Sequence, residues 1–421
     1  MCLCVELIDN ICVKILLCSF MEKSTPDLEN CHDENMINDL PSDLLVKILS
    51  LLPTKDAVAT MVLSKQWLSV WTMVPILTYK ESNNISEGEH KSVWHFLDMS
   101  LKFHKAPILE FFDVELGPQC PVDVDVGKWI INAVDRKVSK LRFELKWSAK
   151  PINLPKSLYT CDTLVFLSLS DMIFVDIVCP AFLPSLKTLY LIHVVYKDED
   201  SLIMLLSSCP LLKLLLMARY KEDNLKNVKL KVSSLENLFY RHERDDDVED
   251  IQVSLVINSP RLKKIFIRDP SGASCSIENT DRLNKATIFS CQTDDNFMRY
   301  PSSLVCLNIV LNITTDDPYD DVPISWNHPA SVPNCLLTHL EIFEWDAYGG
   351  RSEEKELMRY ILGNSLRLKR IAISIKSTSK LEYREKMMDE LKSMSRISES
   401  SQLMFNTKLV QKERVMHVKP E

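Results

Sequence analysis

Cysteine and histidine are the residue types here with the most versatile chemistry, and neither is arranged for catalysis or metal binding. The chain has 13 cysteines and 9 histidines. The cysteines are scattered without a C-x-x-C pair, and no run of cysteine and histidine has the spacing of metal ligands. No nucleophile stands in a recognisable order with a base, and no carboxylate pair suggests acid–base chemistry. We therefore predict no catalytic residues, no metal site and no cofactor.

Individual histidines and cysteines have structural explanations instead. His193 and His339 each stand alone beside an apolar segment, where surface or hydrogen-bonded core histidines are expected. Cys179 and Cys209 each precede a proline, which is typical of turn residues rather than of reactive thiols. Glycine is scarce, at 7 residues, and neither a Walker-type loop nor a dinucleotide fingerprint can be written. This excludes most nucleotide-dependent enzymes.

Composition predicts a folded, water-soluble protein whose partners are proteins. Of the 421 residues, 46% are hydrophobic and 26% are charged, and the length suits either two or three domains or an extended repeat array. The net charge of -8 disfavours nucleic acid, whose phosphates require a basic face. The most apolar stretch, Leu202 to Ala218, is interrupted by Cys209-Pro210 and Lys213, so we predict no membrane span. An odd number of cysteines fits reduced thiols in the cytoplasm or nucleus.

The first twenty residues are apolar but do not resemble a standard secretory signal. They lack a basic start and a small-residue cleavage site, and Glu6, Asp9 and Lys14 interrupt the apolar stretch. We interpret residues 1–20 as an incidental extension, with a secretory signal as the alternative. A chain begun at Met21 is expected to behave like the full chain.

The segment from Leu40 to Trp71 reads LPSDLLVKILSLLPTKDAVATMVLSKQWLSVW. The residues in it that begin or end helices predict three short helices. Pro41 fits a first helical turn, and Pro53 ends that segment. Thr54 is predicted to cap a second helix, and two tryptophans four residues apart lie on one side of a third. The first helix has one wide apolar face, made of Leu44, Leu45, Ile48, Leu49 and Leu52.

This short module carries more apolar surface than roughly 40 residues can bury. The leucine face and the pair Trp67 and Trp71 therefore need to be covered by something else. Either another protein or the rest of the same chain can do so, and periodicity alone does not choose between them.

The string L-P-x-D-L-L-x-x-I-L-x-L-L-P-T-K-D-A-V-A…L-S-K-x-W resembles the F-box, the module that docks onto the Skp-type adaptor of cullin-RING ubiquitin ligases. One departure is Gln66, where related plant sequences commonly have arginine, and the lost charge is expected to weaken adaptor binding. The resemblance implies that the following residues form the adaptor-facing surface or its immediate support: Leu40, Pro41, Leu44, Ile48, Leu49, Leu52, Pro53, Leu63, Ser64, Lys65 and Trp67.

Beyond a linker around residues 80 to 92, the apolar pattern φ-x-x-φ-x-φ recurs. Successive motifs start 21 to 33 residues apart, mostly near the period that marks leucine-rich repeats. Three are preceded by proline in the same register, in LP-SLKTLYL, CP-LLKLLLM and SP-RLKKIFI. The motifs are Val138-Leu141-Phe143, Leu164-Leu167-Leu169, Leu186-Leu189-Leu191, Leu212-Leu215-Met217, Leu235-Leu238-Tyr240, Leu262-Ile265-Ile267, Leu283-Ala286-Ile288, Leu304-Leu307-Ile309, Leu337-Leu340-Ile342 and Leu368-Ile371-Ile373.

Each motif predicts a short strand that sends its apolar residues into a shared core, so a curved solenoid is the expected result. The irregular spacing and the missing asparagine ladder mark the repeats as degenerate. An ordinary α/β domain with similar strands is the alternative.

The segment from Pro333 to Ile373 resembles the FBD domain that closes many plant F-box proteins with leucine-rich repeats. Leu357, Tyr360 and Ile361 predict one apolar helix face, and the helix ends at Gly363 or Asn364. We interpret the segment as a terminal cap that shields the last repeat from water.

Three central motifs place polar and aromatic residues away from the core. Alternation along each strand puts these side chains on the exposed concave face. They are Asn237, Phe239 and Arg241, then Lys264, Phe266 and Arg268, then Lys285, Thr287 and Phe289. From this set we predict a target-binding site at Phe239, Arg241, Lys264, Phe266, Arg268, Lys285 and Phe289, with an acidic or phosphorylated target segment. The alternative is that these charges are solvated and pack over aromatic neighbours of the array itself.

The sequence thus predicts an α/β (α+β) repeat protein: a short three-helix F-box, then a curved leucine-rich-repeat solenoid with a C-terminal capping region. The predicted division is an N-terminal extension at 1–35, the F-box at 36–75, a linker and N-terminal repeat cap at 76–135, repeats at 136–332, the FBD domain and C-terminal cap at 333–405, and a tail at 406–421.

The resemblance implies a non-catalytic substrate-recognition subunit of a Skp-cullin-F-box ubiquitin ligase. It would bind the adaptor, and through it a cullin, by the F-box and an unknown protein target by the repeats. The alternatives are a binding scaffold outside any ligase and a small-molecule co-receptor built on the same repeats.

Overall fold

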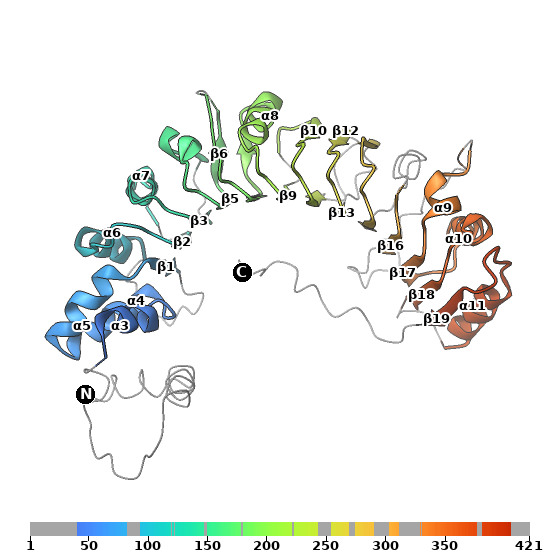
Figure 1. Ribbon diagram of the computed structural model, residues 1–421, viewed down its shortest axis with the longest axis horizontal. Helices are drawn as coiled ribbons and strands as arrows, with labels where there is room; N and C mark the ends of the chain where they lie inside the picture. Colours follow the sequence, from blue (N-terminus) through green and yellow to red (C-terminus); the bar gives the residue numbers. More distant parts are fainter. Residues whose placement is uncertain are drawn as a thin grey trace, which may run out of the picture. The chain divides into compact units, whose positions relative to one another are not determined.

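The computed structural model describes residues 40–81, 93–118, 120–121, 123–146, 150–177, 180–220, 223–242, 254–268, 274–289, 303–310, 329, 331–376 and 381–405. The chain forms two compact units, with the boundary between residues 173 and 174. Each unit contains its own parallel strands, helices and buried core (Figure 1). The predictions for residues 1–20, for a start at Met21 and for the tail at 406–421 lie outside the described residues. Most of the predicted linker at 80 to 92 lies outside them as well.

The first unit begins with short helices separated by proline and serine. Helix α3 spans Ser42–Leu49, α4 spans Thr54–Ala59 and α5 spans Lys65–Val70. Two 3-10 turns that the sequence did not predict, η1 at Thr60–Val62 and η2 at Trp71–Met73, follow α4 and α5. Pro41 and Pro53 stand immediately before α3 and α4, where a residue without a backbone donor is tolerated.

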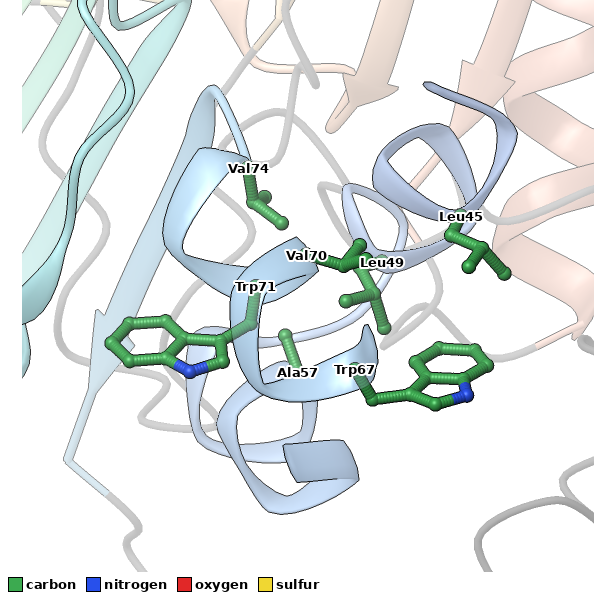
Figure 2. Packing of buried hydrophobic residues seen from close by; sticks show 7 residues of the cluster. All are labelled: Leu45, Leu49, Ala57, Trp67, Val70, Trp71 and Val74. Atoms are coloured by element: carbon green, nitrogen blue, oxygen red, sulfur yellow. The ribbon is translucent and has the colours of Figure 1, made fainter. Parts of the chain in front are cut away.

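These helices enclose a small core of their own. It consists of Leu45, Leu49, Ala57, Trp67, Val70, Trp71 and Val74 (Figure 2). Trp67 is 4% exposed and Trp71 is 6% exposed, so both are covered within the chain, which is one of the two alternatives that periodicity left open. Figure 2 shows their rings pointing in opposite directions, and the centroid of the Trp71 ring lies 6.2 Å from that of His104.

Thr54 has a different role from the predicted helix cap. It is the first residue of α4, and its hydroxyl accepts a hydrogen bond from the backbone N–H of Thr78 at 2.7 Å. Thr78 belongs to strand β1, Ile76–Lys80, so this bond ties α4 to the first strand of the sheet. The prediction of a cap is therefore wrong, because a tertiary partner takes the hydroxyl.

A buried histidine joins the helices to the strands that follow. His104 accepts a hydrogen bond from Arg136 Nη1 at Nδ1 (2.7 Å), and its Nε2 lies 2.9 Å from the Val74 carbonyl oxygen. Since a guanidinium can only donate, Nδ1 carries no proton, and Nε2–H donates to Val74. The carbonyl of Thr72 also accepts the backbone N–H groups of Lys105 and Ala106, at 2.7 and 3.0 Å. The helices are thus fastened to the sheet by several bonds rather than by a bare linker.

The first unit carries a parallel sheet with the strand order β1-β2-β3-β5. Figure 1 shows α6 and α7 on one side of these strands. The elements after β1 are α6 at Val93–Phe103, β2 at Phe111–Leu116, α7 at Gly127–Asp135, β3 at Lys140–Leu145, β4 at Ile152–Asn153, the 3-10 turn η3 at Lys156–Thr160, and β5 at Phe166–Asp171.

The second unit continues the pattern with the parallel strand order β7-β9-β11-β13-β15-β16-β17-β18-β19. Their bounds are β7 Thr188–Ile192, β9 Leu214–Arg219, β11 Asn237–His242, β13 Lys264–Arg268, β15 Lys285–Phe289, β16 Cys306–Val310, β17 Ile342–Tyr348, β18 Arg370–Ile375 and β19 Gln402–Phe405. Alternate residues of β11, β13 and β15 are buried, so one face of each strand packs on the core and the other remains partly accessible.

A second layer covers the buried face of these strands. It contains β6 at Ile173–Val175, β8 at Val195–Tyr196, α8 at Glu199–Ser207, β10 at Asn227–Lys231, β12 at Ser254–Asn258 and β14 at Ser274–Glu278. Strands β10, β12 and β14 form a small parallel sheet. Figure 1 shows α8, β10 and β12 on the same side of the strands β9 and β13, which leaves the opposite face of those strands without this cover.

Helices cover the last strands of the second unit. They are α9 at Asn334–Thr338, α10 at Ser352–Asn364 and α11 at Leu381–Ser393. Helix α10 confirms the helix predicted from Leu357, Tyr360 and Ile361, and it ends at Asn364. Leu357 and Ile361 are buried and Tyr360 is half-buried, so the predicted apolar face packs inward.

Candidate functional site

The residues that the sequence assigns to an adaptor-facing surface differ widely in exposure. Leu49 and Trp67 are buried in the helical core, where they act as support. Four of the predicted residues are exposed: Pro41, Pro53, Leu63 and Lys65. Five are half-buried: Leu40, Leu44, Ile48, Leu52 and Ser64. Leu40 and Leu52 pack against the core cluster. The predicted apolar face of the first helix therefore splits into an inner part and an outer part.

The helices also present large apolar side chains that the sequence analysis did not single out. Val62 is 65% exposed and Leu51 is 62% exposed. The others are Leu68 at 52%, Met73 at 44% and Met61 at 43%, beside the predicted Leu63 at 38%. Helix α5, which carries Leu68, packs against the turn η1, which carries Met61 and Val62. We call Leu51, Met61, Val62, Leu63, Leu68 and Met73 the exposed apolar set.

One signal in the sequence pointed to this set. Met61, Val62 and Leu63 form a consecutive apolar run just before Ser64, and a run of this kind cannot place every side chain on one inner face. Of this run only Leu63 was predicted to face the adaptor, because it is the one that matches the F-box motif.

Gln66, the position that departs from related sequences, makes a contact inside the chain. Its amide Nε2 donates to the carbonyl oxygen of Leu40 at 3.4 Å, which links α5 to the chain two residues before α3. This hydrogen bond is long. An arginine at position 66 could donate a hydrogen bond to the same carbonyl oxygen.

A second site lies on the accessible face of β11, β13 and β15. The register pairs Asn237 with Lys264 and Lys264 with Lys285 in one row across the strands. The next row along the strands contains Phe239, Phe266 and Thr287, and the third contains Arg241, Arg268 and Phe289. The structure therefore brings all seven predicted target-binding residues onto one face. We call these nine positions the basic–aromatic stripe.

Aromatic rings form a continuous line through the stripe. The ring centroids of Phe239 and Phe266 are 5.8 Å apart, and those of Phe266 and Phe289 are 4.7 Å apart. The guanidinium of Arg268 lies 5.9 Å from the centre of the Phe289 ring, within the range of a cation–π contact. All three rings remain half-buried rather than buried. They support one another and still offer surface to a ligand.

The charge of the side chains on this face differs on the strands to either side of the stripe. On β9, the residues in the same rows are Leu214, Leu216 and Ala218, which carry no charge. Two strands away on the other side, β17 places Glu344 and Asp346 on this face. Glu344 is engaged by Arg370 at 2.6 Å. Between β9 and β17, the basic residues of this face therefore lie on β11, β13 and β15, and the next one, Arg370 of β18, is paired with Glu344.

Comparison with known proteins adds the context of the whole chain. Residues 37–79 match the F-box domain, residues 126–293 match the leucine-rich repeats of FBD-associated F-box protein At5g56370, and residues 328–373 match the FBD domain. The chain is 43% identical to the F-box/FBD/LRR-repeat protein At1g22000 of Arabidopsis thaliana, over 91% of this chain and 94% of that protein.

Two further Arabidopsis thaliana relatives are similar over most of their length. The FBD-associated F-box protein At1g05080 is 42% identical over 90% of this chain and 99% of its own. The F-box/FBD/LRR-repeat protein At3g49480 is 40% identical over 86% of this chain and 94% of its own. The chain belongs to the plant F-box/FBD/LRR-repeat family. It is thus an F-box protein with the domains of a substrate-recognition protein, and F-box domains generally bind Skp-type adaptors.

The FBD part of this F-box/FBD/LRR-repeat protein is organised around a buried carboxylate. Glu354 is 2% exposed and accepts hydrogen bonds from the backbone N–H groups of Gly349 and Gly350, both at 2.7 Å. Burial raises the pKa of this carboxyl group, although the backbone hydrogen bonds act in the opposite direction. Gly350 has a φ of 72°, a conformation that favours glycine. These contacts fix the turn between β17 and α10, which is a structural role.

Three described thiols of this F-box/FBD/LRR-repeat protein are poorly suited to nucleophilic chemistry. Burial raises the pKa of Cys120, of Cys209 and of Cys335 to about 11, so each stays protonated near neutral pH. Among the described residues, no three His, Cys, Asp or Glu side chains are grouped so as to hold a metal ion. Within the same residues, no helix has the length and apolar character needed to cross a membrane.

Proposed function

We propose that this protein is the substrate-recognition subunit of a Skp-cullin-F-box ubiquitin ligase. In this proposal a three-helix F-box at residues 36–75 binds the adaptor, repeats at 136–332 bind the target, and the segment 333–405 caps the repeat array. Residues 1–35 are an extension, residues 76–135 are a linker and the N-terminal cap of the repeats, and residues 406–421 are a tail. The chain itself is non-catalytic and works in the cytoplasm or nucleus, where it holds the target near the catalytic subunits.

The observation that carries the proposal is the exposed apolar set on the F-box helices. These helices have a closed core of their own, so the exposed side chains are not needed to complete it. A soluble protein with such a set on one short module has a surface suited to another protein. Leu44 and Ile48, two predicted contact residues that are half-buried on α3, belong to the same short module.

The direct test is copurification with a Skp-type adaptor after coexpression. Val62→Asp is expected to weaken adaptor binding more than 100-fold. Covering the side chain contributes about 1–2 kcal/mol, and placing a carboxylate in a dry interface costs several kcal/mol more. Because Val62 is 65% exposed, this change leaves the helical core intact. The double change of Leu44 and Ile48 to aspartate is expected to abolish binding as well, but both residues are half-buried and need a folding check.

A matched control is Phe182→Asp, which changes an equally exposed apolar residue outside the F-box. Phe182 is 59% exposed and lies between β6 and β7. It is expected to leave adaptor binding unchanged. If Val62→Asp retains the adaptor while its melting temperature matches the unmodified chain, the assignment of this surface is wrong.

We also propose that targets bind the basic–aromatic stripe through an acidic or phosphorylated segment. The support is the row arrangement of lysines, phenylalanines and arginines on one accessible face. Replacing Arg241, Lys264 and Arg268 together by glutamate is expected to abolish target capture and leave adaptor capture unchanged. Undiminished accumulation of targets on that variant would show that they bind elsewhere.

The alternative functions predict different proteins or small molecules bound to the chain. A binding scaffold outside any ligase would copurify without a cullin, whereas the proposed ligase subunit brings the cullin through the adaptor. A small-molecule co-receptor would capture its target only when the small molecule is added. Isolation from cells with and without proteasome inhibition separates these functions.

A further inference from the structure

The basic–aromatic stripe has its positive charges at two separate positions along the strands. Lys264 and Lys285 stand at the start of β13 and β15, and both are exposed. Arg241 and Arg268 stand at the ends of β11 and β13. Lys264 and Arg268 are four residues apart on one strand, which corresponds to about 13 Å.

Apolar surface fills the space between the two charged positions. Phe239 and Phe266 occupy the middle row, and their ring centroids are 5.8 Å apart. Phe266 has the central place, because it lies between Lys264 and Arg268 on the same strand and the same face. The order along β13 is therefore cation, aromatic ring, cation.

An extended peptide has the same repeat as the strand beneath it. Its side chains at i, i+2 and i+4 point to one side, and those at i and i+4 are also about 13 Å apart. A peptide with acidic side chains at i and i+4 and an apolar side chain at i+2 therefore matches both charged positions and the ring between them.

The surroundings favour a peptide that runs along β13 rather than across many strands. A peptide that crossed toward β17 would meet Asp346, which repels acidic side chains, and Glu344, whose charge is already paired with Arg370. One that crossed toward β9 would meet Leu214, Leu216 and Ala218, which offer no cation. Only the direction of the strand joins the lysine row to the arginine row across the phenylalanines.

We infer that the stripe recognises an extended acidic peptide with the pattern acidic–x–apolar–x–acidic, laid along β13 with its acidic residues on the lysine row and the arginine row. The inference rests on the proposed use of this face for target binding, and it adds the register and the chemical class of the target segment. Phosphoserine in place of either acidic residue places more negative charge at the same point and fits the same two rows.

The test uses fluorescent synthetic peptides and the full chain copurified with its adaptor. Three peptides of one composition contain one phenylalanine and two glutamates, with the glutamates at i and i+2, i and i+4, or i and i+6, and in the two longer spacings the phenylalanine lies between the glutamates. In the shortest one the phenylalanine is moved outside the pair. Fluorescence anisotropy measures the affinity of each. The i, i+4 peptide is expected to bind roughly tenfold tighter than the other two, because only it reaches both rows together.

A charge-reversal pair tests the lysine row. Lys264→Glu with Lys285→Glu is expected to lower the affinity for the i, i+4 peptide roughly tenfold and to remove the preference for its spacing. The matched control is Lys229→Glu with Lys231→Glu, which changes the net charge equally on exposed residues of β10, in the other sheet of the unit. The control is expected to retain both the affinity and the spacing preference.

Three outcomes overturn the inference: equal affinity for all three spacings, no binding of any peptide, or equal losses in the stripe and control variants. A phosphoserine peptide that binds more tightly with the same spacing supports it. Failure of the adaptor to copurify would refute the proposed ligase function, and the peptide preference would then be measured on the chain alone.

Discussion

Acidification is expected to weaken the joint at His104 between the F-box helices and the first repeat strands. His104 is 4% exposed, and its pKa falls from 6.5 to about 4. Burial is the main cause and the charge of Arg136 adds to it, while the hydrogen bond to Val74 acts in the opposite direction. Protonation would place an N–H at Nδ1 facing the guanidinium that now donates to it.

The direction of the pH dependence follows from this lowered pKa. The unfolded chain takes up the proton near pH 6.5, whereas the folded chain does so only near pH 4. The stability that His104 contributes is therefore fully present above pH 6.5 and is lost as the pH falls toward 4. At about pH 5 the loss amounts to roughly 2 kcal/mol, since each pKa unit corresponds to about 1.4 kcal/mol.

His104→Gln isolates this contribution, because glutamine can accept from Arg136 and donate to Val74 but does not titrate. Urea unfolding followed by tryptophan fluorescence gives the free energy of unfolding at about pH 7.5 and about pH 5. The unmodified chain is expected to lose roughly 2 kcal/mol more than the variant over this interval. His339→Gln, a change at an exposed histidine, serves as the matched control. An equal loss in the unmodified chain and in His104→Gln would refute the reasoning.

Two further predictions concern the second unit. Asp223→Asn is expected to destabilise it by about 3–5 kcal/mol, because the Arg219 guanidinium, with a side chain 1% exposed, would lose the charge of its buried carboxylate partner. Asp176→Asn, at an ion pair whose lysine is 50% exposed, is expected to cost under about 1 kcal/mol, and equal urea midpoints for the two variants would contradict this. Gly350→Ala is expected to cost about 1–2 kcal/mol, since φ is 72° and a Cβ atom would lie 2.6 Å from the Met387 sulfur. A melting temperature equal to that of the unmodified chain would show that this turn is not strained by a side chain.

The sequence by itself determined the repeating strands, because each strand needs only a local alternation of apolar residues. Nine of the ten motifs from Val138 to Ile373 correspond to strands β3, β5, β7, β9, β11, β13, β15, β16 and β18. The motif Leu337-Leu340-Ile342 was wrong by three residues: Leu337 lies in α9 and is 37% exposed, and the core residues of β17 are Phe343 and Trp345. The same spacing is present in Val74-Leu77-Tyr79 and in Leu109-Phe112-Val114, which belong to β1 and β2, but it was not recognised there. The stripe was also accessible from sequence, since alternation and a common register place its residues on one face.

Only the tertiary structure decided which side of each helix is covered. Trp67 and Trp71 were expected to need cover either from another protein or from the rest of the chain, and both are buried in the core cluster of the chain itself. The reason is that periodicity identifies an apolar face but not its neighbour.

The small sheet of β10, β12 and β14 likewise depended on packing between repeats. Each of its strands is only five residues long, and it forms by pairing with segments some 20 residues or more away. Such short segments have little preference of their own for the strand conformation, and the contacts between neighbouring repeats supply it. The role of Thr54 was decided in the same way, because its hydroxyl bonds to Thr78, which is 24 residues away and comes close only in the folded chain.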